Sequence, residues 1–362
     1  MDEEITDSGG LREAYFKNTA KKITFIVLFA VLAFGLFWVS LCIGTRELSI
    51  ERVYALLIDH ISGVKYIPGT LDAFDDNIVW NYRVPRALFA IIAGASLSVA
   101  GAVMQSVMKN PLADAYTTGV SSGALFGVAI AVVLGFTMGG GGIDGIGVML
   151  NAVIFSLFPI IAIVAMAPMF NRSPSTLILA GIAVSYLFNS LTSLLLVSTS
   201  AENLSTVYNW QVGSLTELSW DSIPAASLSL FVGVLILWPI ANKLNLMSLD
   251  DKDAKALGLD SEKYRVMCLV LIALMVSTVI SYAGIIGFIG LVIPHIVRMV
   301  LGADNRYVIP GSMAFGAFFL LACDIVSRWI DVSANVPVGV VTSLIGAPIF
   351  MILIIRQKKG VW

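Results

Sequence analysis

The sequence predicts an all-α polytopic membrane protein with about ten transmembrane helices. Of its 362 residues, 58% are hydrophobic and 13% are charged, and the mean hydropathy is +0.90. Soluble domains are about one-quarter charged. A helix of about 20 apolar residues is long enough to span a bilayer, and several uncharged stretches of the chain reach that length. Because a chain in lipid must hydrogen-bond its own backbone, these stretches predict helices.

The uncharged runs also predict where the spans lie. Residues 266–297 carry no formal charge but include Gly284, Gly287, Gly290 and Pro294. They predict one full helix, a tight reversal and a second, shorter helix. The other predicted spans are 23–43, 87–108, 115–136, 146–169, 175–198, 222–241, 308–328 and 336–355.

Basic residues predict the orientation. All but six of the 22 Lys and Arg residues fall in the terminal segments and in alternate loops. The positive-inside rule places these segments in the cytoplasm. The prediction is a cytoplasmic segment 1–22, a ten-helix domain 23–355 and a cytoplasmic tail 356–362 in a cell-membrane protein. The six exceptions on the outer side are Arg46, Arg52, Lys65, Arg83, Arg86 and Arg328.

Two loops are long enough to carry structure. The outer loop 44–82 begins with the amphipathic segment "TRELSIERVYALLIDHI", which predicts either a surface helix on the membrane or bundle, or a plain connector. In the inner loop 243–265, Ser248 and Asp251 approximate a capping box. Gly258 can end that helix in a left-handed conformation, and Asp260 or Ser261 can cap a second short helix. The loop is either a solvated connector or a docking surface for a soluble partner.

Polar groups within the spans are few. Asp324 precedes Arg328 by one helical turn, which favours an intrahelical ion pair over a transport role. His295 is interpreted as a structural group, and Cys42, Cys268 and Cys323 as small core residues. The chain has no GxxxxGK[ST] loop, and no arrangement of acid, base or nucleophile argues for an enzyme. Small residues recur along the spans and fit either close helix packing or an unobstructed pore wall: Gly94, Ala95, Ser96, Gly101, Ala102, Gly119, Ser121, Ser122 and Gly123.

Several motifs resemble one known family. "RVPR", "GAVMQ" and "NPLA" within 81–124, and "GFIGLVIPH" within 284–311, resemble the signatures of permeases of iron-complex and cobalamin ABC importers. Further resemblance in 177–190, 322–330 and 336–354 extends it over the chain from about residue 23 onward. It implies a type II importer permease: a homodimer with the solute path at its interface. Two ABC ATPase subunits would dock inside and a solute-binding protein outside.

The resemblance also implies roles for individual residues. Arg83, Arg86 and Arg328 match arginines that dock the binding protein, where charge would steer encounter; snorkelling arginines are the alternative. Asn110, Leu112, Pro174 and Ser175 match a cytoplasmic gate, although Pro174 stands where a relative carries a hydroxyl residue. Segment 248–263 resembles the coupling helices that contact the ATPase, with the residues Ser248, Asp251, Ala254, Leu257, Gly258 and Leu259.

The expected function is therefore ATP-driven import of an iron complex, with ferric siderophore first, haem next and cobalamin after them. The chain itself is expected to bind no cofactor, metal or nucleic acid, and ATP and Mg belong to the partner ATPase. The alternative is a secondary transporter coupled to an ion gradient, which would need more charged groups inside the spans. A membrane enzyme or signalling scaffold would need a convergent catalytic or metal site.

Overall fold

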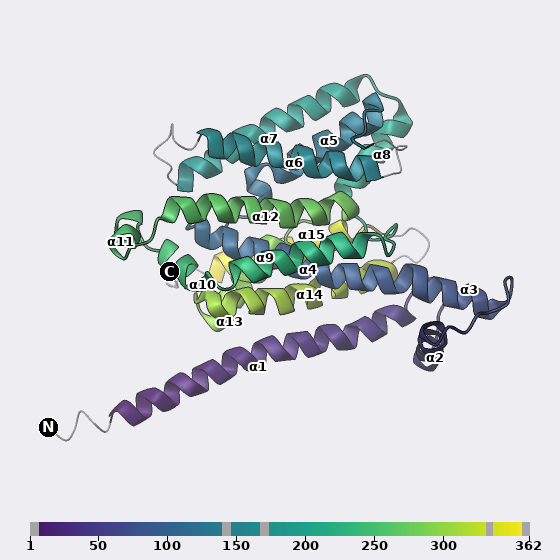
Figure 1. Cartoon of the computed structure of the whole chain (residues 1–362), viewed down its shortest axis with the longest axis horizontal. Helices are drawn as coiled ribbons and strands as arrows, with labels where there is room; N and C mark the ends of the chain where they lie inside the picture. Colours follow the sequence, from purple (N-terminus) through teal and green to yellow (C-terminus); the bar gives the residue numbers. More distant parts are fainter. Residues whose placement is uncertain (1–6, 140–145, 167–173, 331–335, 357–362) are drawn as a thin grey trace.

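The computed structural model describes residues 7–139, 146–166, 174–330 and 336–356, and every regular element in these ranges is helical. The long helices run roughly side by side in one bundle (Figure 1). They are α1 (Asp7–Cys42), α4 (Val84–Val107), α5 (Val120–Leu134), α6 (Ile146–Met166), α7 (Pro174–Val197), α9 (Ser222–Leu237), α12 (Ser261–Ala283), α13 (Ile289–Leu301), α14 (Asn305–Ile330) and α15 (Val338–Arg356).

These ten helices coincide with the ten predicted spans, so the predicted polytopic helical fold is confirmed. In the described part of the chain, seven helices are long and apolar enough to cross a membrane. Helix α9 makes an eighth span if α10 (Ala241–Met247), bent from it by 67°, is counted with it. Helices α5 and α13 are shorter apolar helices of 15 and 13 residues.

Short elements distinguish the two ends of the bundle. We call one the hairpin end, because it carries α2 (Ile50–Ile61) and α3 (Leu71–Asn77). The other is the knuckle end, which carries α10, α11 (Asp251–Ala256) and the turn 108–114. Helix α8 (Ala201–Val212) lies at the hairpin end, and the N-terminal part of α1 points beyond the knuckle end (Figure 1).

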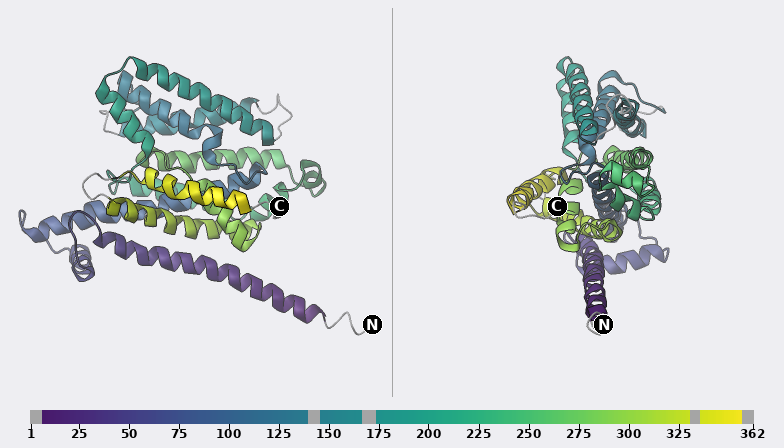
Figure 2. Two further views of the ribbon diagram at one scale, coloured as in Figure 1. Left: turned by 180° about the vertical axis from the view of Figure 1, so that it is seen from behind. Right: turned by 90° about the vertical axis from the view of Figure 1, so that its left-hand side faces the viewer.

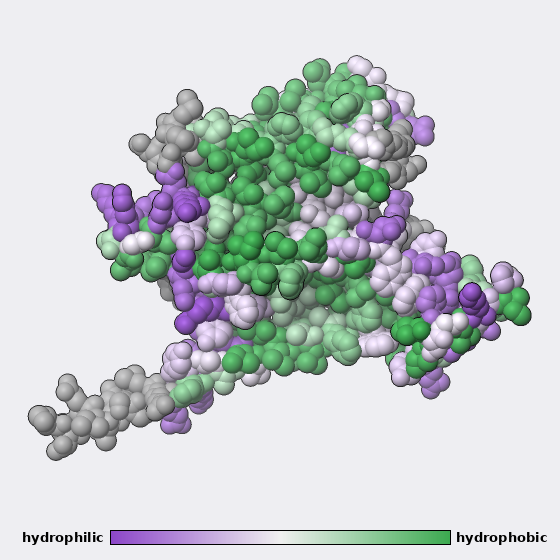
Figure 3. Space-filling view, viewed as in Figure 1, coloured by the Kyte–Doolittle hydropathy of each residue, from purple (hydrophilic) through white to green (hydrophobic). Residues whose placement is uncertain are grey.

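Helix α4 is the centre of the molecule. It packs against α14, α13, α12 and α9, and 83% of its most apolar stretch is buried, against 17% for that of α1. Helix α1 lies at one edge of the bundle, while α5, α6 and α7 lie at the opposite edge (Figure 2). On the face shown in Figure 3, the surface between the two ends is predominantly apolar, as a lipid-facing surface requires.

Small residues let the central helices touch. A Cβ atom on Gly101 would overlap the backbone of Gly290 in α13, and one on Gly94 would overlap the carbonyl of Gly316 in α14. Gly123 of α5 meets the Phe155 carbonyl of α6 in the same way. Close helix packing and an unobstructed pore wall were the two predicted roles of the small residues. At these three glycines the structure shows close helix packing.

One predicted boundary is wrong. Residues 71–107 form one continuous helical stretch rather than an outer loop that ends at residue 82. Its middle is a π-helical turn, Ile78–Arg83, in which the amide of Val84 bonds to the carbonyl of Val79. Proline inside a helix clashes with the carbonyl four residues earlier, and the wider turn lets the helix continue through Pro85. Similarly, α1 begins at Asp7, well before the predicted span; residues 1–6 and 357–362 of the predicted termini lie outside the described residues.

The inner loop also differs from its prediction. Ser248 ends α10 and donates to the Asn245 carbonyl instead of capping α11, whose N-cap Asp250 makes no side-chain capping bond. The capping box does not form because α11 begins at Asp251, which is therefore its first residue and not the third, as a capping box requires. Gly258 is left-handed as predicted, with φ +82°. Asp260 caps a helix as predicted, but this helix is the long α12 and not a second short one.

Candidate functional site

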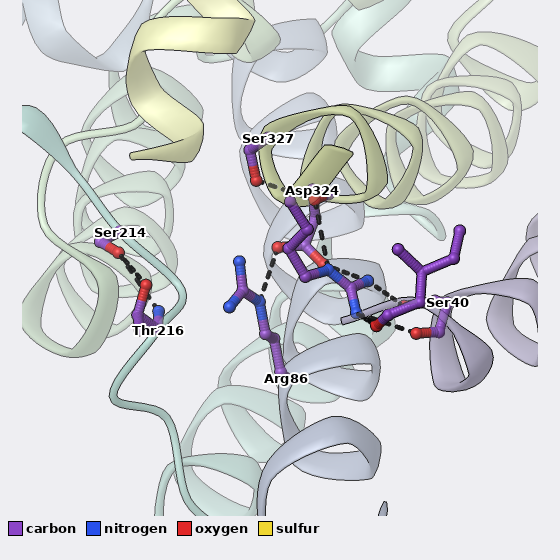
Figure 4. A network of polar contacts seen from close by, with 8 residues as sticks. Ser40, Arg86, Ser214, Thr216, Asp324 and Ser327 are labelled. Carbon is purple, nitrogen blue, oxygen red and sulfur yellow. Dashed lines mark hydrogen bonds and ion pairs between the residues drawn. The ribbon is translucent and has the colours of Figure 1, made fainter. Parts of the chain in front are cut away.

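The three arginines of the predicted docking site lie at the hairpin end, and two of them share one carboxylate. Asp324 of α14 is fully buried, and its two oxygens lie 2.8 Å from Arg86 Nε and 2.8 Å from Arg328 Nη2. Figure 4 shows Arg86 reaching Asp324 from α4 across the helix interface. The predicted ion pair between Asp324 and Arg328 is thus confirmed, and Arg86, 238 residues away in sequence, joins it.

Two of these arginines also hold the end of α1. Arg328 Nη1 donates to the carbonyls of Ser40 and Ile43 at 2.9 and 2.8 Å. Arg83 Nη1 donates to the Leu41 carbonyl at 2.7 Å, and its Nη2 donates to the Arg46 carbonyl. Arg83 and Arg328 are buried, and the Arg86 side chain is 13% exposed. Docking of a binding protein stays a prediction, and Arg86 is the least buried of the three.

A second arginine-centred network lies at the knuckle end, and the sequence analysis did not single out its arginine, Arg298. Arg298 of α13 is buried and donates to the Ala102 carbonyl at 2.8 Å, Ser106 Oγ at 2.7 Å and Asn305 Oδ1 at 3.1 Å. It also donates to Gln105 Oε1 at 3.3 Å. The available signal was a cation in the last turn of an apolar helix, three residues before its end. Arg298 thereby ties α13 to α4 and α14.

Asn245 extends this network to α10. Its amide nitrogen donates to Asp304 Oδ1 at 2.9 Å, and its amide oxygen accepts from the Asn305 side chain at 2.9 Å. Asp304 is also bound by Arg306. Burial raises the pKa of Asp304, but the hydrogen bonds from Arg306 and Asn245 outweigh it and lower that pKa to about 2. Asp304 therefore stays ionised at physiological pH.

The predicted gate residues lie in two separate elements. Asn110 shapes the turn 108–114 by accepting the Leu112 amide on its side chain at 2.9 Å, and Leu112 is 46% exposed. Pro174 and Ser175 begin α7. Among the described residues no hydrogen bond joins the two pairs, so the chain by itself shows two candidate gate parts and no closed gate.

The turn 108–114 is bonded directly to the predicted coupling segment. Lys109 Nζ lies 2.8 Å from Asp251 Oδ1 of α11, and Arg265 Nη2 of α12 lies 3.1 Å from the same oxygen. Arg265 Nε also donates to the Val107 carbonyl at the end of α4. Partial burial raises the pKa of Asp251, but the hydrogen bond from Lys109 and the charge of Arg265 outweigh it, and the net shift is downward.

The other residues of the predicted coupling segment are either buried in the bundle or exposed on its surface. Ala254 and Leu259 are buried, while Leu257 is 62% exposed beside the left-handed Gly258. His295, by contrast, is buried, and neither of its ring nitrogens is hydrogen-bonded to any described residue, so the prediction of a satisfied structural histidine is wrong.

A groove of about 610 Å³ runs beside α15. Its walls come from the end of α8, the turn between α12 and α13, and one face of α15; they include Gln211, Ile285, Gly287, Ser343, Leu344 and Met351. The lining is mainly apolar with a few polar groups, as is usual for small-molecule sites. Sequence reasoning did not predict these residues, because they come from three distant segments.

The long apolar helices and the polar networks at both ends of the bundle indicate a multi-pass membrane protein. Residues 30–356 match the model of the FecCD transport family. The chain belongs to this family, and it is an ABC transporter permease with the type II importer fold.

Relatives and a solved structure agree over most of the chain. The chain is 36% identical to the hemin transport system permease protein HmuU of Yersinia pestis, over 78% of this chain and 84% of that protein. It is 32% identical to the molybdate import system permease protein MolB of Haemophilus influenzae, over 89% and 92%. A solved inward-facing structure of a metal-chelate type ABC transporter is similar with a TM-score of 0.79 at 30% identity, covering 91% of this chain and 98% of that one.

Proposed function

We propose that this chain forms half of the solute path of an ATP-driven importer for a metal chelate. Ferric siderophore is the first candidate, followed by haem and cobalamin. A second copy of the chain completes the path, and two ABC ATPase subunits bind ATP and Mg at the knuckle end. In this proposal the knuckle end and both termini face the cytoplasm, and a solute-binding protein docks at the hairpin end.

The contact between the coupling segment and the gate turn supports this function most directly. Asp251 on α11 binds Lys109 on the turn 108–114 and Arg265 on α12. A displacement of α11 by an ATPase therefore reaches the gate turn and the end of α4 through one side chain. A secondary transporter has no need for such a connection, because its energy comes from an ion bound within the spans.

The groove beside α15 supports a path between two copies. Two of its lining residues, Leu344 and Met351, are 66% and 60% exposed, although they lie on a helix long and apolar enough to span the membrane. A second copy facing this groove would close it into a chamber with apolar walls and a few polar groups. Such walls suit a large chelate with little selectivity, and relatives named for hemin and molybdate are consistent with varied solutes.

The proposal is tested by uptake into proteoliposomes that carry the chain with its ATPase and binding protein. Ferric hydroxamate, haem, cobalamin and molybdate are compared with and without internal ATP. ATP-dependent uptake of one solute is the expected result. Uptake that persists without ATP and collapses with an ionophore would instead establish gradient coupling.

Docking at the hairpin end is tested separately with Arg86→Gln. Arg83 and Arg328 hold the end of α1, so replacing them would disturb the fold as well as the docking surface. Binding-protein affinity is expected to fall, and its salt dependence to weaken, in Arg86→Gln. Unchanged affinity at low ionic strength would remove Arg86 from the docking surface.

A further inference from the structure

Helix α2 lies across the bundle instead of along it. It follows α1 at the hairpin end and is seen nearly end-on in Figure 1, whereas the spans run across that view. In the right-hand view of Figure 2, turned by 90°, the spans are seen end-on and α2 lengthwise. The axis of α2 is therefore roughly parallel to the membrane plane. Ser49 caps its first turn by accepting the Arg52 amide.

Two faces of α2 are apolar, and only one of them is covered by protein. Val53 and Leu56 are buried against the bundle. A second set recurs at spacings of three and four residues and so forms one stripe along the helix: Ile50, Tyr54, Ile58 and Ile61, which are 65%, 57%, 44% and 75% exposed. We call these four residues the α2 stripe. Four large apolar side chains in a row are more than scattered surface residues, and they indicate a contact.

The α2 stripe is continuous with the lipid-facing surface of α1. Tyr54 lies 6.5 Å from Trp38 between ring centroids, and Trp38 lies 6.2 Å from Phe34. Phe34 is 64% exposed on a span whose apolar stretch is only 17% buried. An aromatic row thus leads from the side of α1 to α2. Trp and Tyr are enriched where a membrane meets water, because their rings are apolar and their N–H and O–H groups are polar.

The polar side of α2 is bonded to α3. Arg52 pairs with Asp72 and lies 3.8 Å from Asp75, while His60 Nδ1 lies 3.0 Å from Asp76. Arg46, in the turn before α2, also pairs with Asp75. Helix α3 continues through the π-helical turn into α4. Through these ion pairs, α2 is connected to the end of α4 that lies at the hairpin end.

We infer that α2 is an interfacial membrane helix whose stripe inserts into the headgroup–acyl boundary of the leaflet at the hairpin end. Lipid is the occupant because the stripe continues the lipid-facing surface of α1 and the helix axis lies in the membrane plane. By way of the ion pairs to α3, this anchor holds the start of α4. The inference rests on α1 being a span and does not depend on the transported solute.

Spin labels on the two faces of α2 test this in the full chain. Ile58→Cys and Ile61→Cys place labels on the stripe, and the matched variant Ala55→Cys places one on an exposed position outside it. All three are made with Cys42→Ser, because Cys42 is partly exposed while Cys268 and Cys323 are buried. In phosphatidylcholine–phosphatidylglycerol nanodiscs, collisions with oxygen and with nickel–EDDA are measured for each label.

The labels at 58 and 61 are expected to collide several-fold more with oxygen than with nickel–EDDA, and the label at 55 to show the reverse. Equal nickel–EDDA access on both faces would overturn the inference. So would protection of 58 and 61 that arises only when the solute-binding protein is added, or dipolar broadening between labels on two copies.

A measurement on the unlabelled chain guards against damage by the labels. In hydroxyl-radical footprinting of the same nanodiscs, Tyr54 is expected to react as slowly for its type as Phe34 on the side of α1. Reaction as fast for its type as Lys65, in the exposed turn after α2, would overturn the inference independently.

Discussion

At the hairpin end of α4, Arg86 and Arg328 share the buried carboxylate of Asp324, whereas at the knuckle end Arg298 is held by uncharged oxygen atoms. Both arrangements keep a cation away from water, which is costly unless the charge is paired or fully hydrogen-bonded. In the first, one carboxylate pairs with two guanidinium groups, so removing it leaves both without a counter-charge. In the second, the charge is spread over carbonyl, hydroxyl and amide oxygens of the two helices α4 and α14, and each oxygen contributes a part.

The largest expected effect is therefore at Asp324. Asp324→Ala leaves Arg86 and Arg328 without their counter-charge and is expected to lower the free energy of unfolding by about 3–5 kcal/mol. Unfolding by SDS in mixed micelles measures it. Arg86→Gln is the matched control, because it leaves the pair between Asp324 and Arg328 intact. Equal stability of Asp324→Ala and Arg86→Gln would contradict the sharing of one carboxylate.

A smaller effect is expected at Arg298. Arg298→Gln keeps a donor but cannot reach all the acceptors, so buried oxygens of Ser106 and Asn305 lose partners at a cost of about 1–3 kcal/mol. Arg298→Lys is the control for charge, since it retains the cation without the planar fork. If Arg298→Lys were as stable as the unaltered chain, charge alone would explain the site and the geometry would be irrelevant.

Lys109→Ala is expected to change stability least of the three, by less than about 1 kcal/mol, because its partner Asp251 is exposed. Its effect should appear in function. If Asp251 and Lys109 transmit movement from the ATPase, the ATP hydrolysed per solute transported should rise. Lys255→Ala on the same short helix α11 is the control. If Lys109→Ala hydrolysed as much ATP per solute as the unaltered chain, this ion pair would have no role in coupling.

The same ion pair sets a pH dependence. The folded-state pKa of Asp251 lies below the ordinary value of 3.8. Its contribution is therefore fully present above the ordinary pKa and is lost as the pH falls through the lowered one. Between neutral pH and the ordinary pKa, the stability difference between Lys109→Ala and the unaltered chain should stay constant, and below it the difference should shrink. A change that begins near neutral pH would identify another titrating group.

Local patterns in the sequence predicted much of the fold. Apolar length and the scarcity of charge located the ten helices, including the pair hidden in 266–297. Helical spacing predicted the bond between Asp324 and Arg328, and Gly258 predicted a left-handed turn. Each of these features depends on residues within a few positions of one another, so it is visible without tertiary structure.

The predictions that failed depend on neighbours far away in the chain. Asp251 is the first residue of α11 and not the third, as a capping box requires, and its carboxylate binds Lys109 and Arg265 from other segments. The helix of α4 does not begin at residue 87, because the π-helical turn lets it pass Pro85.

The sequence by itself determined the membrane class and the positions of the long apolar helices, and it proposed the docking, gating and coupling residues. Only the tertiary structure decided that Arg86 reaches Asp324, that Lys109 joins the turn 108–114 to α11 and that the α2 stripe continues the surface of α1. Helix formation and membrane insertion respond to the local run of side chains, whereas buried charges and exposed apolar faces find their partners only when distant helices pack.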